Sequence, residues 1–137
     1  MQKHCLFCGL VLNRHNKIYC SNKCQSDFLY TSFIKRYLDG FESGYSVPGI
    51  SRHVRRWLFE TRGRKCENCG WDKIHPTTKV VPVEVDHVNG DWKNCRPENL
   101  KILCPNCHSL TITFRNLNKG KGRELRLCSS NGRATDL

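Results

Sequence analysis

The chain has 137 residues, with 23 Lys or Arg, 12 Asp or Glu and 10 Cys, and its formal net charge is +11 with His neutral. It contains no run of roughly 18 apolar residues, the length that a membrane helix needs, and its first residues lack the apolar segment of a secretory signal. We therefore expect a soluble cytoplasmic protein with no membrane partner. The excess positive charge favours a polyanionic partner, with nucleic acid as the first hypothesis and anionic lipid as the second.

Most of the cysteines stand in close pairs, a spacing typical of metal ligands, and a reducing cytosol disfavours disulfides. Two pairs can surround one Zn²⁺ tetrahedrally, so the sequence predicts two structural zinc sites. Their ligands would be Cys5, Cys8, Cys20 and Cys24 in the first, and Cys66, Cys69, Cys104 and Cys107 in the second. The segment around the first site has few apolar residues, so zinc would replace a core there. The alternatives are four metal-free buried cysteines, or His4 or His15 as a ligand.

The N-terminal half predicts two helices separated by a linker. Apolar residues recur every three or four positions over 25–38, which predicts an amphipathic helix that Asp39-Gly40 ends. Residues 40–50 contain three Gly and one Pro without periodicity and predict a linker. A second helix is expected to begin after Ser51 and to end before Gly63. Its basic face either contacts phosphate or is only solvated, and consists of Arg52, Arg55, Arg56 and Arg62.

Positive charge flanks a neutral centre. Segments 1–24, 51–70 and 111–137 each carry a net charge of +4, whereas 71–110 carries none. This distribution is expected if basic flanks hold a phosphate backbone while the centre carries carboxylates and a metal ion. The C-terminal residues that we assign to backbone contact are Arg115, Lys119, Lys121, Arg123 and Arg126.

The centre predicts two strands, a loop and a helix. Alternating valines predict a strand over 79–87, in which Pro82 marks an edge or an irregular part, and the turn-rich segment 89–98 predicts a long loop. Residues 99–103 predict the returning strand. Pro105 suits the first turn of a helix that we expect to extend to about Asn116.

Three positions in this frame carry polar residues suited to chemistry. Asp86-His87 ends the first predicted strand, Asn99 begins the second, and His108 follows the last cysteine pair directly. This order, bracketed by cysteine pairs, resembles the HNH endonucleases with the ββα-metal fold, over roughly residues 50–120. With its N-terminal four-cysteine module, the chain is similar to small free-standing HNH proteins of phages and some bacteria.

The resemblance implies metal-dependent hydrolysis of DNA phosphodiester bonds, either nicking or double-strand cleavage, and it favours a homing-type role. His87 would be the general base, a role that suits a side chain titrating near neutral pH. Asp86 and His108 would hold one Mg²⁺ or Mn²⁺, and Asn99 would fix the loop or orient His87. Because adjacent strand residues point to opposite faces, Asp86 and His87 reach one site only if the strand ends or bulges there. One such site cuts one strand at a time, so double-strand cleavage needs a homodimer or two events.

The sequence therefore predicts an α+β zinc protein of four parts: a finger with helix (1–39), a linker (40–50), a nuclease domain (51–120) and a basic tail (121–137). Two other classes of function remain open. One is a non-catalytic zinc module that binds DNA or RNA, and the other is a protein-interaction zinc module. Three further pairs of residues that could bind or react are given other interpretations. His53 and His75 are interpreted as structural or surface residues, Trp71 and Trp92 as core residues, and Cys95 and Cys128 as free thiols.

Overall fold

A computed structural model describes residues 1–16, 18–47 and 49–120 of the chain. The described residues form the α-helices α1 (Asn22–Leu38), α2 (Arg52–Arg62) and α3 (Pro105–Ser109). Two antiparallel strand pairs join β1 (Tyr45–Ser46) to β2 (Gly49–Ile50) and β3 (Glu84–His87) to β4 (Leu100–Leu103). Short 3-10 helices are η1 (Pro97–Asn99) and η2 (Arg115–Asn118). This mixture of helix and sheet confirms the α+β prediction.

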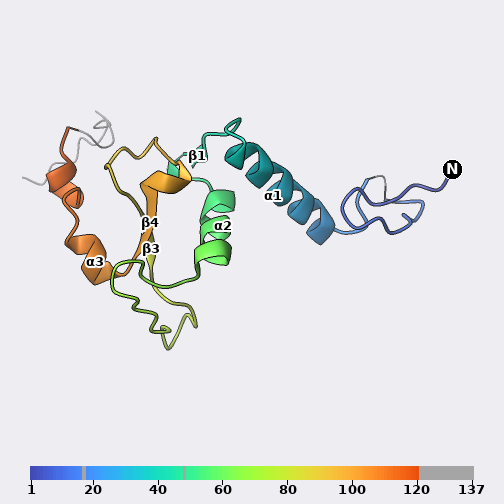
Figure 1. Ribbon diagram of the computed structural model, residues 1–137. Coiled ribbons are helices and arrows are strands. Elements are labelled where there is room, and N and C mark those ends of the chain that lie inside the picture. The colour runs from blue at the N-terminus through green and yellow to red at the C-terminus, as the bar shows by residue number, and fades with distance from the viewer. Residues whose placement is uncertain (17, 48, 121–137) are drawn as a thin grey trace, which may run out of the picture.

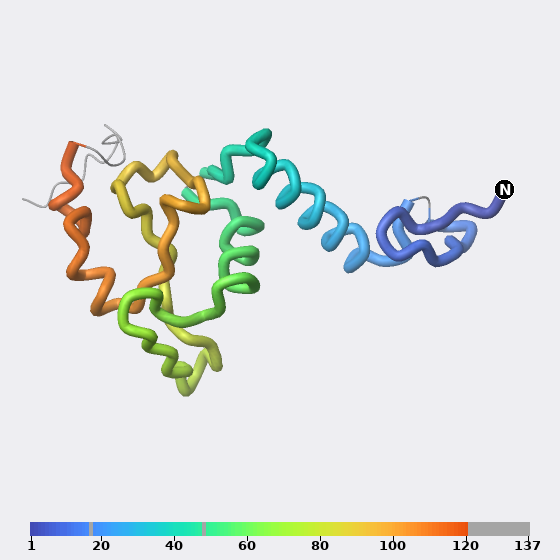
Figure 2. The backbone as a smooth tube through the Cα atoms, viewed as in Figure 1, coloured from blue at the N-terminus to red at the C-terminus, as the bar shows by residue number. Residues whose placement is uncertain are grey.

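The molecule consists of a rounded body with one projecting arm (Figure 1). The body gathers α2, α3 and the β3–β4 pair, while α1 projects from it and carries the N-terminal loops at its far end (Figure 2). A helix of 17 residues spans about 25 Å at 1.5 Å per residue. From about its middle, α1 contacts α2, where the Tyr30 hydroxyl donates to Glu60, so the finger lies beyond the first turns of the helix.

The helix α1 begins three residues earlier than its apolar pattern predicts. Ser21 is its N-cap, and the Ser21 hydroxyl accepts a hydrogen bond from the Cys24 N–H at 3.2 Å. At the other end, Asp39 caps the helix and its N–H donates to the Lys35 carbonyl at 3.0 Å. The predicted end of the helix is therefore confirmed, and the start moves because a capping serine precedes the apolar residues.

The last turn of α1 belongs to the core of the body. Tyr37 is fully buried there, and its hydroxyl donates to the Cys95 carbonyl at 2.6 Å. Residues 40–50, predicted as a linker, contain the β1–β2 hairpin, in which Tyr45 pairs with Ile50. Gly44 has a φ of +73°, and a Cβ there would meet the Tyr37 ring at 2.6 Å. The domain boundaries themselves stay a prediction.

The helix α2 packs its apolar face against the β3–β4 pair. Ser51 is its N-cap, as predicted, and Val54 and Leu58 are fully buried in one cluster with Ile102. At its end, the Arg62 guanidinium donates to the carbonyls of Leu100 and Pro97 at 2.7 and 2.8 Å. These contacts hold α2 against the strand that leads to the second cysteine pair.

The strand predicted over 79–87 is shorter in the structure. Only β3 pairs with a neighbouring strand, whereas Val81 and Val83 are buried without belonging to a strand. The Val83 N–H turns back to the Val81 carbonyl at 2.9 Å, across Pro82. Because proline has no N–H to donate to a ladder, the chain becomes a strand only after it.

Two neighbouring boundaries also need correction. Asn99 lies in η1, so β4 begins one residue later than predicted. The helix after Pro105 ends at Ser109 instead of near Asn116. Thr111 donates through both its N–H and its hydroxyl to the His108 carbonyl, and such local bonds at a β-branched residue compete with a longer helix.

Four side chains interpreted as structural have packing or hydrogen-bond partners. The His53 ring lies 5.1 Å from the Phe33 ring, and His75 Nδ1 accepts two backbone N–H groups. Trp71 packs against the core, and Trp92 meets the Tyr45 ring edge-on at 5.1 Å. No helix among the described residues is long and apolar enough to cross a membrane.

Candidate metal centres and catalytic site

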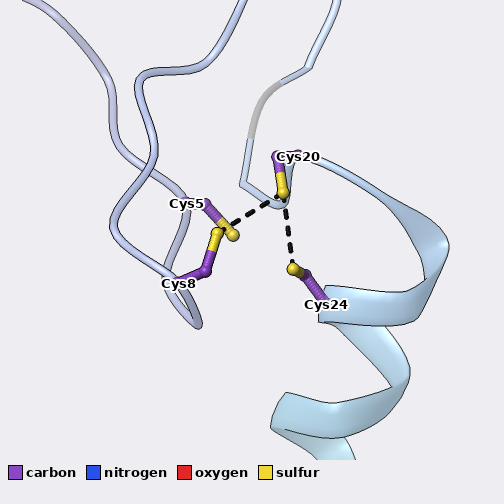
Figure 3. A group of neighbouring side chains, drawn as sticks. All are labelled: Cys5, Cys8, Cys20 and Cys24. Atoms are coloured by element: carbon purple, nitrogen blue, oxygen red, sulfur yellow. Dashed lines mark hydrogen bonds between the residues drawn. The ribbon is translucent and has the colours of Figure 1, made fainter.

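The first four cysteines converge at the tip of the arm. Cys5 and Cys8 come from a loop, while Cys20 and Cys24 flank the start of α1, and all four side chains point toward one centre (Figure 3). Sγ of Cys20 lies 3.5 Å from that of Cys8 and 3.4 Å from that of Cys24. Sulfurs bound to one tetrahedral zinc at about 2.3 Å lie roughly 3.8 Å apart, so this donor set fits Zn²⁺.

The second four cysteines meet at the edge of the body. Their sulfur atoms all lie within 4.8 Å of one another, and Sγ of Cys69 is 3.7 Å from that of Cys104. Cys66 and Cys104 are buried in the core, and Cys107 is partly buried against it. This cluster could also hold a zinc ion, as the sequence predicts. His4 and His15 belong to neither cluster.

One thiol in each cluster is prepared for ionisation by the backbone around it. Burial opposes ionisation of Cys5, but N–H groups of Cys8, Cys20 and Phe7 outweigh it and lower the pKa of Cys5 to about 6. Burial likewise opposes ionisation of Cys66, but hydrogen bonds from nearby backbone N–H groups outweigh it and lower the pKa of Cys66 to about 6. The thiolate is the form that binds metal. Both clusters therefore offer a ligand that is ionised at neutral pH.

The predicted ligands of the catalytic ion face each other between β3 and α3. Asp86 pairs with Lys101 in the β3–β4 register, and its Oδ1 lies 3.6 Å from Nε2 of His108. The Asp86 side chain is 17% exposed and that of His108 is 26% exposed, so both are sheltered but reachable. A carboxylate oxygen and an imidazole nitrogen at this separation could both contact one divalent ion, with water and substrate as its remaining ligands.

Glu84 is a site residue that the sequence reasoning missed. Its Oε2 lies 2.8 Å from Nδ1 of His108, a distance at which Nδ1–H donates to the carboxylate. This contact fixes the ring with its Nε2 edge turned toward Asp86. The period of two along a strand could have found it, because Glu84 and Asp86 lie on the same face of β3.

His87 is the last residue of β3, where the strand gives way to a turn. The register runs regularly from Glu84 to His87, and the Gly90 N–H then donates to the His87 carbonyl at 2.9 Å. The strand thus ends at the predicted position, without a bulge in β3. Nε2 of His87 lies 3.5 Å from Sγ of Cys95, in the loop that follows.

Asn99 is buried and makes its hydrogen bonds to the loop between the strands. Its Nδ2 donates to the Asn94 carbonyl at 2.8 Å and to Oδ1 of Asn89 at 2.9 Å. Its Oδ1 accepts from the Asn89 N–H at 3.1 Å. Of its two predicted roles, these bonds match the one that fixes the loop.

The basic residues predicted to contact DNA differ in whether other groups of the protein already pair with their charges. Arg52 and Arg55 are exposed on α2, whereas Arg56 lies 2.7 Å from Glu60 and 3.7 Å from Asp27. Arg115 and Lys119 are exposed near η2. Arg62, at the end of α2, instead donates to backbone carbonyls. Four predicted residues lie outside the described residues, namely Lys121, Arg123, Arg126 and Cys128.

The chain was compared with known proteins. No family model matches it, and no solved structure matches it. It is 37% identical over 92 residues to the H-N-H endonuclease F-TflIV of Escherichia phage T5, across 65% of this chain and 40% of the relative. The chain thus spans about two fifths of the length of that relative. Its similarity to an H-N-H endonuclease confirms the resemblance that the sequence predicts.

Proposed function

We propose that the protein is a metal-dependent DNA endonuclease whose site lies between β3, β4 and α3. The observation that carries the proposal is the facing pair of Asp86 Oδ1 and His108 Nε2, 3.6 Å apart, with Glu84 holding the other side of the imidazole. The strand β3 and the short helix α3 supply these residues beside a four-cysteine cluster. Similarity to an H-N-H endonuclease supports the same reaction.

In this proposal each residue has a distinct task. His87 would act as the general base and take the proton of the attacking water. General-base catalysis contributes a rate enhancement of roughly 10²- to 10⁴-fold. Asp86 and His108 would hold the divalent ion, which when bound neutralises phosphate charge and helps the leaving oxygen. Glu84 would keep the His108 ring in place, and Asn99 would keep the loop beside His87 in one conformation.

The first experiment is cleavage of supercoiled plasmid by the wild-type protein and by His87→Ala, with Mg²⁺, with Mn²⁺ or with chelator. The histidine control is His4→Ala, at an exposed position in the finger. Asp86→Asn is compared with Asp72→Asn, because Asp72 is exposed and makes none of the contacts described for the site. We expect the two site variants to lose about 10²-fold or more in turnover and the two controls to cleave normally.

The outcomes separate the two main hypotheses. Cleavage that needs the divalent ion and falls in both site variants supports the nuclease. Intact plasmid with a salt-sensitive gel shift would favour the non-catalytic binding module instead. Accumulation of nicked before linear plasmid would indicate single-strand cuts, and a linear product at first turnover would indicate a dimer. The homing-type role stays a prediction.

DNA binding is proposed to use the exposed arginines of α2. Arg52 and Arg55 have solvent-exposed side chains, so they can reach phosphates at low cost. Replacing either with Ala should lower the slope of log affinity against log salt by about one. The same change at Arg56 should have less effect, because Glu60 and Asp27 already neutralise its charge.

A further inference from the structure

A buried thiol lies beside the residue proposed as the base. Cys95 stands outside both four-cysteine clusters, and its side chain is fully buried in the core that contains Tyr37 and Leu100. Its Sγ lies 3.5 Å from Nε2 of His87, within reach of a hydrogen bond to sulfur. Space filling alone does not explain why Cys95 contacts the His87 imidazole at the end of β3.

The hydrogen-bond geometry assigns a direction to this contact. The Cys95 thiol donates to the Trp92 carbonyl at 3.6 Å. Burial, with the nearby charge of Asp91, raises the pKa of Cys95 to about 11, so the group is a thiol at neutral pH. With its only proton directed at Trp92, Sγ can serve His87 as an acceptor, and the ring then carries its proton on Nε2.

The backbone of Cys95 is itself held in place. Its carbonyl accepts from the Tyr37 hydroxyl at 2.6 Å, and its N–H donates to the Lys93 carbonyl at 3.1 Å. Asn99 holds the preceding residue, Asn94, through the Asn94 carbonyl at 2.8 Å. The thiol is therefore a fixed point, and α1 contributes to fixing it.

We propose that Cys95 is a positioning residue: its sulfur accepts the Nε2–H of His87 and holds the imidazole in one orientation at the end of β3. Cys95 acts through His87 and does not touch DNA. This inference rests on the proposed function, in which His87 is the base. Losing this hydrogen bond would weaken the restraint on the ring, and misplacement on the scale of 1 Å can cost up to about 10²-fold.

The test compares Cys95→Ser with Cys95→Ala in the full chain. A serine hydroxyl can also donate and accept, whereas alanine removes both capacities. Both variants lose the packing of the sulfur in the core, so their melting temperatures are measured beside turnover. Turnover should separate them, with Ser within about threefold of wild type, Ala lower by about tenfold or more, and KM for DNA unchanged in both.

A second readout does not depend on cleavage. Ring-nitrogen NMR should find the His87 proton on Nε2 in wild type and in Cys95→Ser, and distributed between both nitrogens in Cys95→Ala. The ring signals of His53, which packs on Phe33, should not move. Equal turnover in the two variants, or a His87 ring unaffected by Cys95→Ala, would each overturn the proposal. If wild type cleaves nothing, the nuclease hypothesis fails, and the NMR result still decides whether Cys95 orients the ring.

Discussion

Each of the two four-cysteine clusters offers four thiols, but the surroundings of the two clusters differ. In the first, only Cys5 is buried, and the neighbouring Leu6 and Leu10 are 62% and 63% exposed. In the second, Cys66 and Cys104 belong to the same buried cluster as Ile102 and Leu103. The same kind of ligand set can therefore have two structural roles. At the tip of the arm the metal would take the place of a hydrophobic core, and in the body it would complete one.

Cys104→Ser tests the second cluster and should have the largest effect. A structural zinc site contributes about 10–16 kcal/mol of apparent binding free energy, comparable to the whole stability of a domain at about 5–15 kcal/mol. Cys104 also joins β4 to α3, which carries His108. We expect one zinc fewer per chain, loss of the cooperative thermal transition and loss of cleavage, measured by metal analysis, calorimetry and plasmid assay.

Cys5→Ser makes the matching change in the arm, and its effect should remain local. Zinc should again fall by one per chain, and amide exchange should rise to unprotected rates before Ser21. The thermal transition of the body should stay within a few degrees of wild type, because among the described residues every buried hydrophobic side chain except that of Cys5 lies at or beyond Tyr30. If the body melted together with the finger, the contrast between the two clusters would be wrong.

The sequence predicted both four-cysteine clusters but only part of the difference between their surroundings. The spacing of the cysteines predicted both clusters, since two ligands per turn is a local property of the chain. That Tyr37 would enter the core of the body, 58 residues from its partner Cys95, depends on how α1 is oriented, and no local pattern encodes that. The linker interpretation of 40–50 missed the hairpin for the same reason, because a two-residue strand leaves almost no alternation to detect.

The candidate site was predictable where residues are close in sequence. Asp86, His87, Asn99 and His108 were named from their order, and Glu84 was accessible from strand periodicity. The contact of Cys95 with His87 was not, because it depends on the path of an irregular loop that Asn99 fixes. The early end of α3 was missed because a helix pattern does not reveal where local threonine bonds will compete with it.

Tyr37→Phe tests the connection between arm and body. It removes the donor to the buried Cys95 carbonyl, and leaving such a group unsatisfied costs about 1–3 kcal/mol of unfolding free energy. Denaturant titration of the body should show this loss with an unchanged slope. The control is Tyr19→Phe, in the finger, where the ring packs on Phe28 and the same change should leave the body unaffected.

The smallest effects come from the two helix caps, Ser21 in the arm and Ser51 in the body. Both hydroxyls accept a backbone N–H at 3.2 Å, from Cys24 and His53 respectively, so the local chemistry is the same. Ser51→Ala should lower the unfolding free energy of the body by about 1 kcal/mol, because α2 unfolds only with the core. Ser21→Ala should leave that transition unchanged and raise amide exchange only in the first turn of α1, since that turn lies outside the core and opens alone. Equal losses in the two variants would mean that arm and body unfold as one unit, and the division of labour between the two clusters would then have no basis.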